Sequence, residues 1–542
     1  MNSNELPSTG ALQTGSGANS CSTGCPARHT FYFFLISLAL VFGSFTVGRK
    51  VNVDENVFVA SAALLARQSA LIYRDFHYNH MPTLVLIYAA LFKVTDYFLL
   101  AARSVSALCA AGAAAIFFDV AYKTFAFLNA RRRMVFALGV GLLYLCNPLF
   151  TRTAGRAWNH DFPVLMSLLG FLALNAGLEK KCLLRLAASG LFVSLAVTSR
   201  LTFATELLPF CLFILIYPNV SLPDRIRLFA AFTIGGVIAL LPSAYVWAQS
   251  PANAYFGNFQ YPAFNTEWHF LHDNQSHHRY ALLTKIGFFL FNICIEMPGN
   301  GVIFFTSVAL FCRLVPRWRD MLKDARHSRL LIVAVLAASQ LAAGLVPSPP
   351  FFQYFYAATP FLLLFVIYAF AELPHTITLN KNNWVWLGCL VLTFGFAVPE
   401  YRDLPYLFWP PAWWPVQAHR AGIAIAKVTA ESKAAGRVQV LTLDPIYVLE
   451  GGVPIYPELA TGPFGIRVGD YLTRQQRTTY KMWGRDDIRN LFDHHPPPAM
   501  MISAGSDGEI EALFIKQAES HGYRRVEVNK KNPSIVVWEA PN

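Results

Sequence analysis

Long apolar runs separated by short polar segments dominate the first 400 positions of the chain. The runs at 31–47, 134–150 and 330–346 each approach the roughly 20 residues that an α-helix needs to cross about 30 Å of hydrocarbon. None of them shows the polar stripe of a helix on the surface of a soluble protein. The pattern therefore predicts an α-helical polytopic membrane protein.

Short clusters of Lys and Arg between the apolar runs predict how these helices are oriented. Such clusters stay on the cytoplasmic side, and those at 131–133 and 313–329 do so only if 56–73 and 82–92 are helices lying at the outer interface. About eleven spans then alternate, with the N-terminus cytoplasmic and the C-terminus on the periplasmic or external face of the inner (plasma) membrane. The predicted spans are 31–47, 99–120, 134–150, 162–178, 183–198, 201–217, 228–247, 286–315, 330–346, 355–370 and 384–398. The run at 286–315 is either one long helix or an interfacial piece followed by a span.

The two ends of the chain differ from this apolar body. Residues 1–28 are rich in Ser, Thr, Gly and Asn, which predicts a disordered cytoplasmic tail before a transmembrane domain at 29–400. Pro and Trp crowd positions 401–416, as in an interfacial linker. Residues 417–542 predict a small external α/β domain. Its strands are expected at 438–443, 499–503, 525–528 and 535–539, and its helices near 417–431 and 507–520.

Composition supports the membrane prediction and removes one class of partner. Of 542 residues, 55% are apolar and only 14% are charged, against about 25% charged in soluble domains. The net charge of +12 is spread over short clusters between apolar runs rather than gathered on one domain. We therefore expect membrane lipids as partners and no nucleic acid. Most of the nine cysteines lie in or beside apolar runs, and no disulfide scaffold is implied.

The predicted outward loops hold a concentration of charged residues. Asp54 and Glu55 directly follow the first span, and Asp161 directly precedes the span at 162–178. Carboxylates at a membrane boundary are costly unless they are paired or solvated, so they are candidates for catalysis. For Glu55 alone, a solvated loop residue is an equal alternative. The candidates for substrate binding are Arg74, His80, Arg103, Arg152, Arg156, His160 and Arg200. Anchoring to lipid headgroups remains the alternative for the arginines.

The order of these motifs resembles the GT-C glycosyltransferases, in particular the group of protein O-mannosyltransferases and aminoarabinose transferases. That group has an acidic pair after the first span, an interfacial helix, a polar segment leading into Pro, and then an AAR.xSAL string. The matching strings here are Asp54-Glu55, 60–73, Asn79-His80-Met81-Pro82 and 101–108. A second acidic site matches Asp161, and a late Tyr and Pro element matches Tyr354 or Tyr356 with Pro360. Where the family often has two prolines preceded by Glu or Lys, this chain has His80-Met81-Pro82.

The resemblance implies transfer of a sugar from a polyprenyl-phosphate donor to a hydroxyl of a glycan, lipid or protein acceptor, by an inverting mechanism. Asp54 would act as general base, and the cations would stabilise the departing phosphate. Tyr354 is a further candidate for substrate binding. No cofactor is specified, and a divalent metal held by Asp54 and Asp161 is an open alternative. A transporter or flippase of lipid-linked glycans is the alternative function. It is disfavoured because the carboxylates gather at one face and no internal repeat is evident.

Two further segments carry open alternatives. The aromatic loop at 255–280 could cover a sugar site or form an interfacial belt. The C-terminal domain has no phosphate-binding fingerprint after a strand. It is interpreted either as a module that recognises the acceptor or as a structural one.

Overall fold

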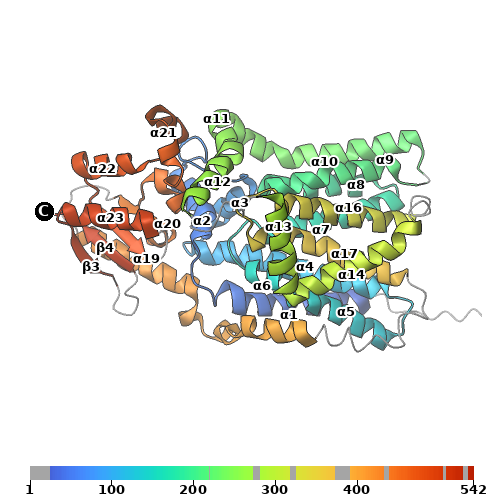
Figure 1. Ribbon diagram of the computed structural model, residues 1–542. Coiled ribbons are helices and arrows are strands. Elements are labelled where there is room, and N and C mark those ends of the chain that lie inside the picture. The colour runs from blue at the N-terminus through green and yellow to red at the C-terminus, as the bar shows by residue number, and fades with distance from the viewer. Residues whose placement is uncertain are drawn as a thin grey trace, which may run out of the picture.

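The computed structural model describes residues 25–218, 220–272, 281–317, 325–372, 391–431, 439–503, 508–528 and 535–541. Long helices form a bundle, and a small sheet with its own helices sits at one end of that bundle (Figure 1). The predicted fold class, a helical membrane protein with a small C-terminal α/β domain, is confirmed. The first helix already begins at Cys25, and residues 1–24 of the predicted tail lie outside the described part of the chain.

Within the part of the chain that the structure describes, six helical segments are each long and apolar enough to cross a membrane. All six fall on predicted apolar runs, because length and composition decide both the prediction and the structure. They are α1 with η1 (Cys25–Val41 and Phe42–Thr46), α4 (Phe98–Thr124), α7 (Asp161–Glu179), α10 (Leu222–Gln249), α16 (Ala325–Leu345), and η7 with α17 (Phe352–Ala358 and Thr359–Ala371).

The other predicted spans are shorter or broken helices. The run at 286–315 is bent by 111° between η5 and α14. The run at 134–150 is divided at Asn147, whose side chain caps the second, short helix. Residues 384–390 of the run at 384–398 lie outside the described residues, and 391–397 are helical. The helices concerned are α5 (Ala130–Leu145), α6 (Pro148–Thr153), α8 (Leu183–Ser199), η2 with α9 (Leu201–Glu206 and Leu207–Ile216), α13 (Leu282–Phe288), η5 (Phe289–Ile295) and α14 (Pro298–Leu314).

Contacts at the two ends of the bundle show in which direction the first helix runs. At one end, the ring of Tyr122 meets His29 and lies 3.7 Å from the guanidinium carbon of Arg133. At the other end, the N–H of Trp414 donates to the carbonyl of Val47 at 2.9 Å. The first helix therefore starts at the end that carries the 131–133 cluster and finishes beside the C-terminal domain.

Glycines allow a close helix crossing between α8 and α10. A Cβ added at Gly190 would lie 1.8 Å from the carbonyl oxygen of Phe232, and one at Gly235 would lie 1.8 Å from that of Ala187. Small residues let membrane helices approach to backbone contact in this way. The crossing fixes α8, which ends at Arg200 beside the cavity described below.

Helices α2 (Val53–Gln68) and α3 (Thr83–Phe92) lie between the bundle and the sheet (Figure 1). They correspond to the two predicted interfacial helices. The strand order is β1-β2-β4-β3, with β1 and β2 parallel and the other pairs antiparallel. All four predicted strands are confirmed, with shifted ends only at β1 and β3. The strands are β1 (Val440–Thr442), β2 (Ala499–Ser503), β3 (Arg524–Glu527) and β4 (Ile535–Glu539).

Strands β1, β2 and β4 are buried on both faces, because side chains alternate between two cores along each of them, whereas the edge strand β3 is mostly exposed. Val440 and Met501 join a core that also contains residues of α2, α3 and α4, such as Leu64. Leu441 and Met500 join a second core inside the C-terminal domain. The C-terminal domain and the α2–α3 layer therefore share one continuous hydrophobic core.

Short helices link these parts and complete the C-terminal domain. Helix α12 lies in the predicted aromatic loop, and α19 and α23 match the two predicted C-terminal helices. They are η6 (Val315–Arg317), α11 (Pro251–Tyr255), η3 (Phe256–Gln260), α12 (Tyr261–His272), η8 (Val398–Tyr401), η9 (Leu404–Phe408), η10 (Pro410–Ala412), α19 (Trp414–Glu431), α20 (Pro445–Glu450), η11 (Pro457–Leu459), η12 (Gly462–Gly465), η13 (Gly469–Tyr471), α21 (Arg474–Tyr480), α22 (Arg485–His494) and α23 (Gly508–Ser520).

Candidate active site

A cavity of about 820 Å³ lies where the bundle, α2 and the C-terminal domain meet. Binding sites for small molecules commonly have volumes of about 300–1,000 Å³. Asp54 lines this cavity, together with His80, His160, Arg200 and Tyr354 from the predicted set of site residues. The cavity therefore brings together residues that are up to 300 positions apart in the sequence.

Three consecutive side chains in the first turn of α2 point in three different directions. Successive residues of an α-helix point about 100° apart, so Asp54 lines the cavity, Glu55 faces α4 and Asn56 faces the C-terminal domain. Asn56 donates to Asp444 at 3.2 Å and accepts from the N–H of Ile446 at 3.3 Å. Asn52 caps the helix and accepts from the N–H of Asp54 at 3.0 Å.

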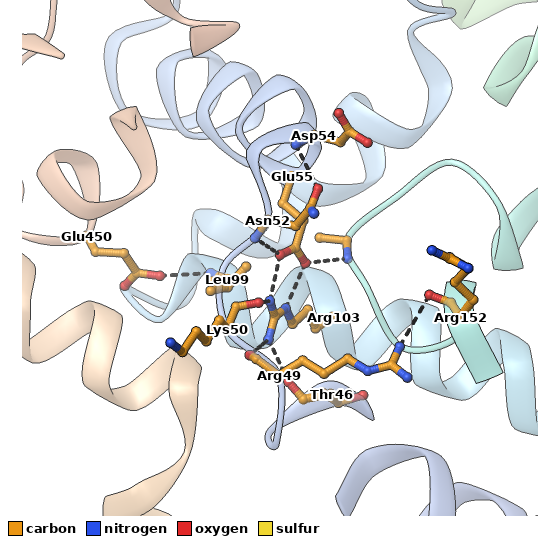
Figure 2. Close-up of polar contacts among 11 residues, drawn as sticks. Thr46, Arg49, Lys50, Asn52, Asp54, Glu55, Leu99, Arg103, Arg152 and Glu450 are labelled. Carbon is orange, nitrogen blue, oxygen red and sulfur yellow. Dashed lines mark hydrogen bonds and ion pairs between the residues drawn. The ribbon is translucent and has the colours of Figure 1, made fainter. Parts of the chain in front are cut away.

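Glu55 forms a fully buried ion pair with Arg103 of α4 (Figure 2). The guanidinium donates to both carboxylate oxygens, at 2.7 and 2.6 Å. Its remaining donors reach the backbone carbonyls of Thr46, Arg49 and Lys50. The Glu55 carboxylate also accepts from two backbone N–H groups, at 2.9 Å each. Every donor of Arg103 is used, so this pair joins the segment 46–50, α2 and α4.

The pKa of Glu55 shows how strongly this pairing acts. Burial alone would raise it, but the charge and hydrogen bonds of Arg103 hold it below its usual value. Glu55 therefore stays ionised and does not line the cavity. The prediction that it is catalytic is not supported by its position, because its carboxylate is committed to Arg103 and the backbone.

Asp54 has the opposite surroundings. Its carboxylate points away from the Glu55–Arg103 pair (Figure 2), and it makes no hydrogen bond within the described part of the chain. Burial raises its pKa, while the positive charges of Arg467 and Arg156 partly oppose that rise. A carboxylate with a raised pKa in a cavity is suited to accept a proton near neutral pH.

Arg200 is the predicted cation that lines the cavity. Its guanidinium bonds to both ring nitrogens of His160, lies 5.6 Å over the ring of Tyr354, and donates to Thr202 at 3.2 Å. Burial, followed by the charge of Arg200, lowers the pKa of His80 to about 3. His80 is therefore neutral at physiological pH, and Arg200 supplies positive charge on this side of the cavity.

The C-terminal domain contributes residues that the sequence did not single out. Phe464 and Arg467 line the cavity opposite the loops of the bundle. The guanidinium carbon of Arg467 lies 4.6 Å from the ring centroids of both Trp268 and Phe464. No local pattern around 462–467 predicts this role, because only the tertiary packing brings the segment to Asp54.

Asp161 is placed away from the cavity, in a structural position at the start of α7. It is buried, accepts from the N–H of Gly155 at 3.0 Å, and accepts from the hydroxyl of Tyr356 at 3.4 Å. Gly155 has a φ of +73°, which favours glycine. Asp161 therefore holds the turn that precedes it, and the predicted shared site of Asp54 and Asp161 is not formed.

The remaining predicted arginines also lie outside the cavity wall. Arg74 is exposed and paired with Asp75 at 2.7 Å. Arg152 is exposed and stacks on Phe352 at 4.3 Å. Arg156 lies 5.0 Å over the ring of Trp158, which itself lines the cavity. Of these three, only Arg156 is close enough to influence the charge of Asp54.

A metal held by Asp54 and Asp161 was one alternative from the sequence. Among the residues that the structure describes, no three His, Cys, Asp or Glu side chains are grouped so that they could hold a metal ion. Asp161 is also bonded to Gly155 and Tyr356 rather than turned to the cavity. The residues in place therefore do not form the predicted metal site.

A bundle of membrane helices, an interfacial helix pair after the first span and an acidic residue at a cavity beside a C-terminal domain together define a GT-C type of membrane fold. Two solved structures of ArnT from Cupriavidus metallidurans are similar to the chain. The structure of ArnT bound to undecaprenyl phosphate has a TM-score of 0.56 at 14% identity, and covers 95% of this chain and 100% of that one. The apo structure has a TM-score of 0.55 at 13% identity, with 95% and 99% covered.

At 14% sequence identity the similarity establishes the fold alone. The predicted resemblance to the aminoarabinose transferase group is therefore confirmed for the fold. No protein-family model and no curated protein sequence matches the chain.

Proposed function

We propose that the protein is a membrane glycosyltransferase that moves a sugar from a polyprenyl-phosphate donor to an acceptor hydroxyl. The observation that carries this proposal is the carboxylate of Asp54, which stands at the cavity without a hydrogen-bond partner among the described residues. The similarity to ArnT, one structure of which holds undecaprenyl phosphate, supports a lipid-linked donor. The sugar donor and a glycan, lipid or protein acceptor are thus the proposed partners.

The proposed reaction is a single displacement at the anomeric carbon. Asp54 takes the proton of the acceptor hydroxyl as its oxygen forms a bond to that carbon. The bond from the anomeric carbon to the phosphate oxygen breaks, and its electron pair stays on the phosphate. The products are the glycosylated acceptor and polyprenyl phosphate. One displacement inverts the anomeric configuration.

Arg200 is the proposed partner of the departing phosphate. It is held by His160, Thr202 and Tyr354, so its guanidinium is positioned before the substrate arrives. A pre-positioned cation stabilises charge that develops in the transition state. His80 and His160 would assist as neutral hydrogen-bonding groups.

The cavity wall also offers hydrogen-bonding groups suited to a sugar. Asn79 Oδ1, Trp158 Nε1 and Asn265 Oδ1 have no hydrogen-bond partner within the described chain, and all three residues line the cavity. Aromatic rings from α12 and the C-terminal domain complete the wall. Helix α12 lies in the aromatic loop that the sequence suggested as a cover for a sugar site.

We further propose that the cavity faces away from the cytoplasm. The basic clusters gather at the end of the bundle opposite the C-terminal domain. Because such clusters stay on the cytoplasmic side, this favours a cytoplasmic N-terminus and a C-terminal domain on the external face of the inner membrane. In this arrangement 29–400 is the catalytic membrane domain, 401–416 the interfacial linker and 417–542 the external domain. Thiol labelling of single cysteines at Arg132 and Ser520 should report opposite sides, and labelling from the same side would contradict this orientation.

The donor class can be tested with purified protein in nanodiscs. We expect transfer from a polyprenyl-phosphate sugar to acceptors in an extract of the native membranes. A nucleotide sugar alone should give no product, because the cavity is proposed to face away from the nucleotide-sugar pool. Robust turnover with a nucleotide sugar alone would overturn the proposal.

A further inference from the structure

Glu206 is an ionisable residue that the proposed mechanism does not use. It ends η2 and is fully buried, and the apolar helix α9 follows it directly. Ionisable side chains inside a bundle of membrane helices are rare and costly, so they mark functional positions. The carboxyl group of Glu206 does not line the cavity, whereas the preceding residue, Thr205, does.

Two helices of the bundle hold this carboxyl group. Its Oε2 is hydrogen-bonded to the hydroxyl of Ser167 in α7. Its Oε1 accepts from the side-chain amide of Gln340 in α16 at 2.8 Å. Ser167 and Gln340 are themselves buried. Glu206 therefore fastens the end of η2 to both α7 and α16.

The 3₁₀ helix η2 depends on support from its surroundings. It has six residues, whereas 3₁₀ runs of more than three or four residues are uncommon because their hydrogen bonds have poorer geometry. At the start of η2, Arg200 connects it to α8, which the glycine crossing fixes. At its end, Glu206 bonds to α7 and α16. The helix η2 is thus held at both ends.

Polar contacts run along η2 from Glu206 to Arg200. The amide of Gln340 also lies 3.5 Å from the hydroxyl of Thr205. Thr205 donates to the carbonyl of Thr202 at 3.0 Å, and the hydroxyl of Thr202 accepts from Arg200 Nε at 3.2 Å. Arg200, Thr202 and Thr205 all line the cavity. The position of the guanidinium is therefore coupled to the buried end of η2.

We propose that Glu206 is a positioning residue, which fixes η2 against α7 and α16 and thereby holds the Arg200 guanidinium against the phosphate of the donor. This inference rests on the proposed function, in which Arg200 binds that phosphate. A group that supports a cation from behind need not touch the substrate, and misplacement by about 1 Å can reduce a rate about 10²-fold. Without the carboxyl group of Glu206, Ser167 and Gln340 lose their partner and η2 can shift.

The test measures binding of undecaprenyl phosphate to purified protein in nanodiscs of neutral lipid. Arg200→Gln should weaken binding at least about tenfold, as expected when a charge-assisted contact is lost. Glu206→Met keeps the length of the side chain without its hydrogen bonds and should weaken binding several-fold, up to about tenfold. Glu206→Gln should retain most of the affinity, because its amide can accept from Gln340 and donate to Ser167. Gln340→Leu removes the same contact from α16 and should resemble Glu206→Met, so the test does not depend on the folding of one variant.

A double variant distinguishes positioning from a general structural role. If Glu206 acts through Arg200, Glu206→Met should weaken binding no further once Arg200→Gln is present. If the two losses multiply instead, the inference is overturned. Ser307→Ala is the matched control, because it removes a buried hydroxyl that lies 3.3 Å from the carbonyl of Leu362 and so joins α14 to α17. This control should bind undecaprenyl phosphate like the wild type.

The outcomes separate this inference from the proposed function. Failure of wild-type protein to bind undecaprenyl phosphate, or unchanged binding in Arg200→Gln, would contradict the proposed function and this inference with it. If Arg200→Gln weakens binding while folded Glu206→Met and Gln340→Leu bind like the wild type, only the inference is overturned. Equal weakening in Ser307→Ala would show a general loss of structure and would also overturn it.

Discussion

Two carboxylates that are adjacent in the sequence have very different surroundings in this structure. Glu55 lies in a closed cluster, where Arg103 and two backbone N–H groups satisfy both of its oxygens. Asp54 lies at an open cavity, and its carboxylate has no hydrogen-bond partner within the described chain. The comparison teaches that the two residues of an acidic pair after a first span can have different roles. Glu55 holds the loop in place, whereas Asp54 is available for the proposed catalysis.

The same comparison explains why the proposed base, Asp54, is positioned so firmly. Glu55 joins α2 to α4, and Asn56 joins α2 to the C-terminal domain. Asp54 precedes both on the same helical turn, so its backbone is held from two sides. Catalytic groups gain from such rigid support, because small displacements reduce the rate strongly.

The largest expected effect is on turnover, when Asp54 at the open cavity is changed. Asp54→Asn keeps the size of the side chain but cannot accept a proton. We expect turnover to fall by about 10²–10⁴-fold, the typical contribution of a general base, while binding of undecaprenyl phosphate is retained. Transfer from a polyprenyl-phosphate sugar and lipid binding should be measured on the same preparation.

Asp486→Asn, at an exposed site on α22, serves as the control and should behave like the wild type. Near-normal turnover in correctly folded Asp54→Asn protein would show that the base lies elsewhere and that the two carboxylates do not differ as proposed.

For Glu55 in the closed cluster, the expected effect of substitution is on the stability of the protein. Glu55→Gln would leave the buried charge of Arg103 without its counter-ion. Breaking a buried ion pair by removing one partner destabilises a protein by about 3–5 kcal/mol. Thermal unfolding in detergent should show a large loss of stability, and the loss should not be reversed by undecaprenyl phosphate.

Arg67→Gln is the matched control, because it breaks an exposed pair with Asp96 near the other end of α2. Exposed pairs contribute about 0–1 kcal/mol, so this variant should remain close to the wild type. A Glu55→Gln protein of unchanged stability but lost activity would instead place Glu55 in the chemistry.

Much of the fold could be predicted because it depends on local pattern. Apolar length defined the spans, and alternation defined the four strands of the sheet. Asp54 could be predicted because it directly follows a span and matches a family motif. Asp161 satisfied similar criteria yet turns to Gly155 and Tyr356. Sequence position alone cannot tell a buried carboxylate with partners from one without.

Arg467 marks the other limit of prediction. It lies more than 400 positions after Asp54, in a segment without a recognisable motif, and reaches the cavity only through packing on Trp268 and Phe464. For the run at 286–315, the sequence left open one long helix or an interfacial piece with a span, and the structure shows two helical parts bent by 111°. Its continuous apolar composition does not mark where the bend falls.

The pH dependence of turnover should sharpen the contrast between the two carboxylates. Burial raises the pKa of Asp54, and the base works only when deprotonated. Turnover should therefore fall as pH decreases, up to about tenfold per unit below that pKa, starting above the ordinary aspartate value of about 3.9. Arg467→Gln removes a charge that lowers this pKa, so it should move the acid limb to higher pH. A limb unchanged in that variant would contradict the proximity of the two groups.

The smallest expected effect concerns a second carboxylate cluster, which ties the C-terminal domain to α4. Glu450 accepts from the N–H of Leu99 at 2.8 Å (Figure 2), and its other oxygen lies 2.8 Å from His419 Nδ1. The hydrogen bond to Glu450 raises the pKa of His419, as does the charge of Asp96, and burial raises the pKa of Glu450.

Groups whose folded pKa is raised stabilise the protein most at low pH and lose that contribution as pH rises through the folded value. We therefore expect thermal stability to decline by about 1 kcal/mol as pH rises above about 6.5. His419→Gln should flatten this decline, whereas His521→Gln, at a more exposed pair with Asp493, should not. An unchanged slope in His419→Gln would show that this contact does not couple the domain to the bundle.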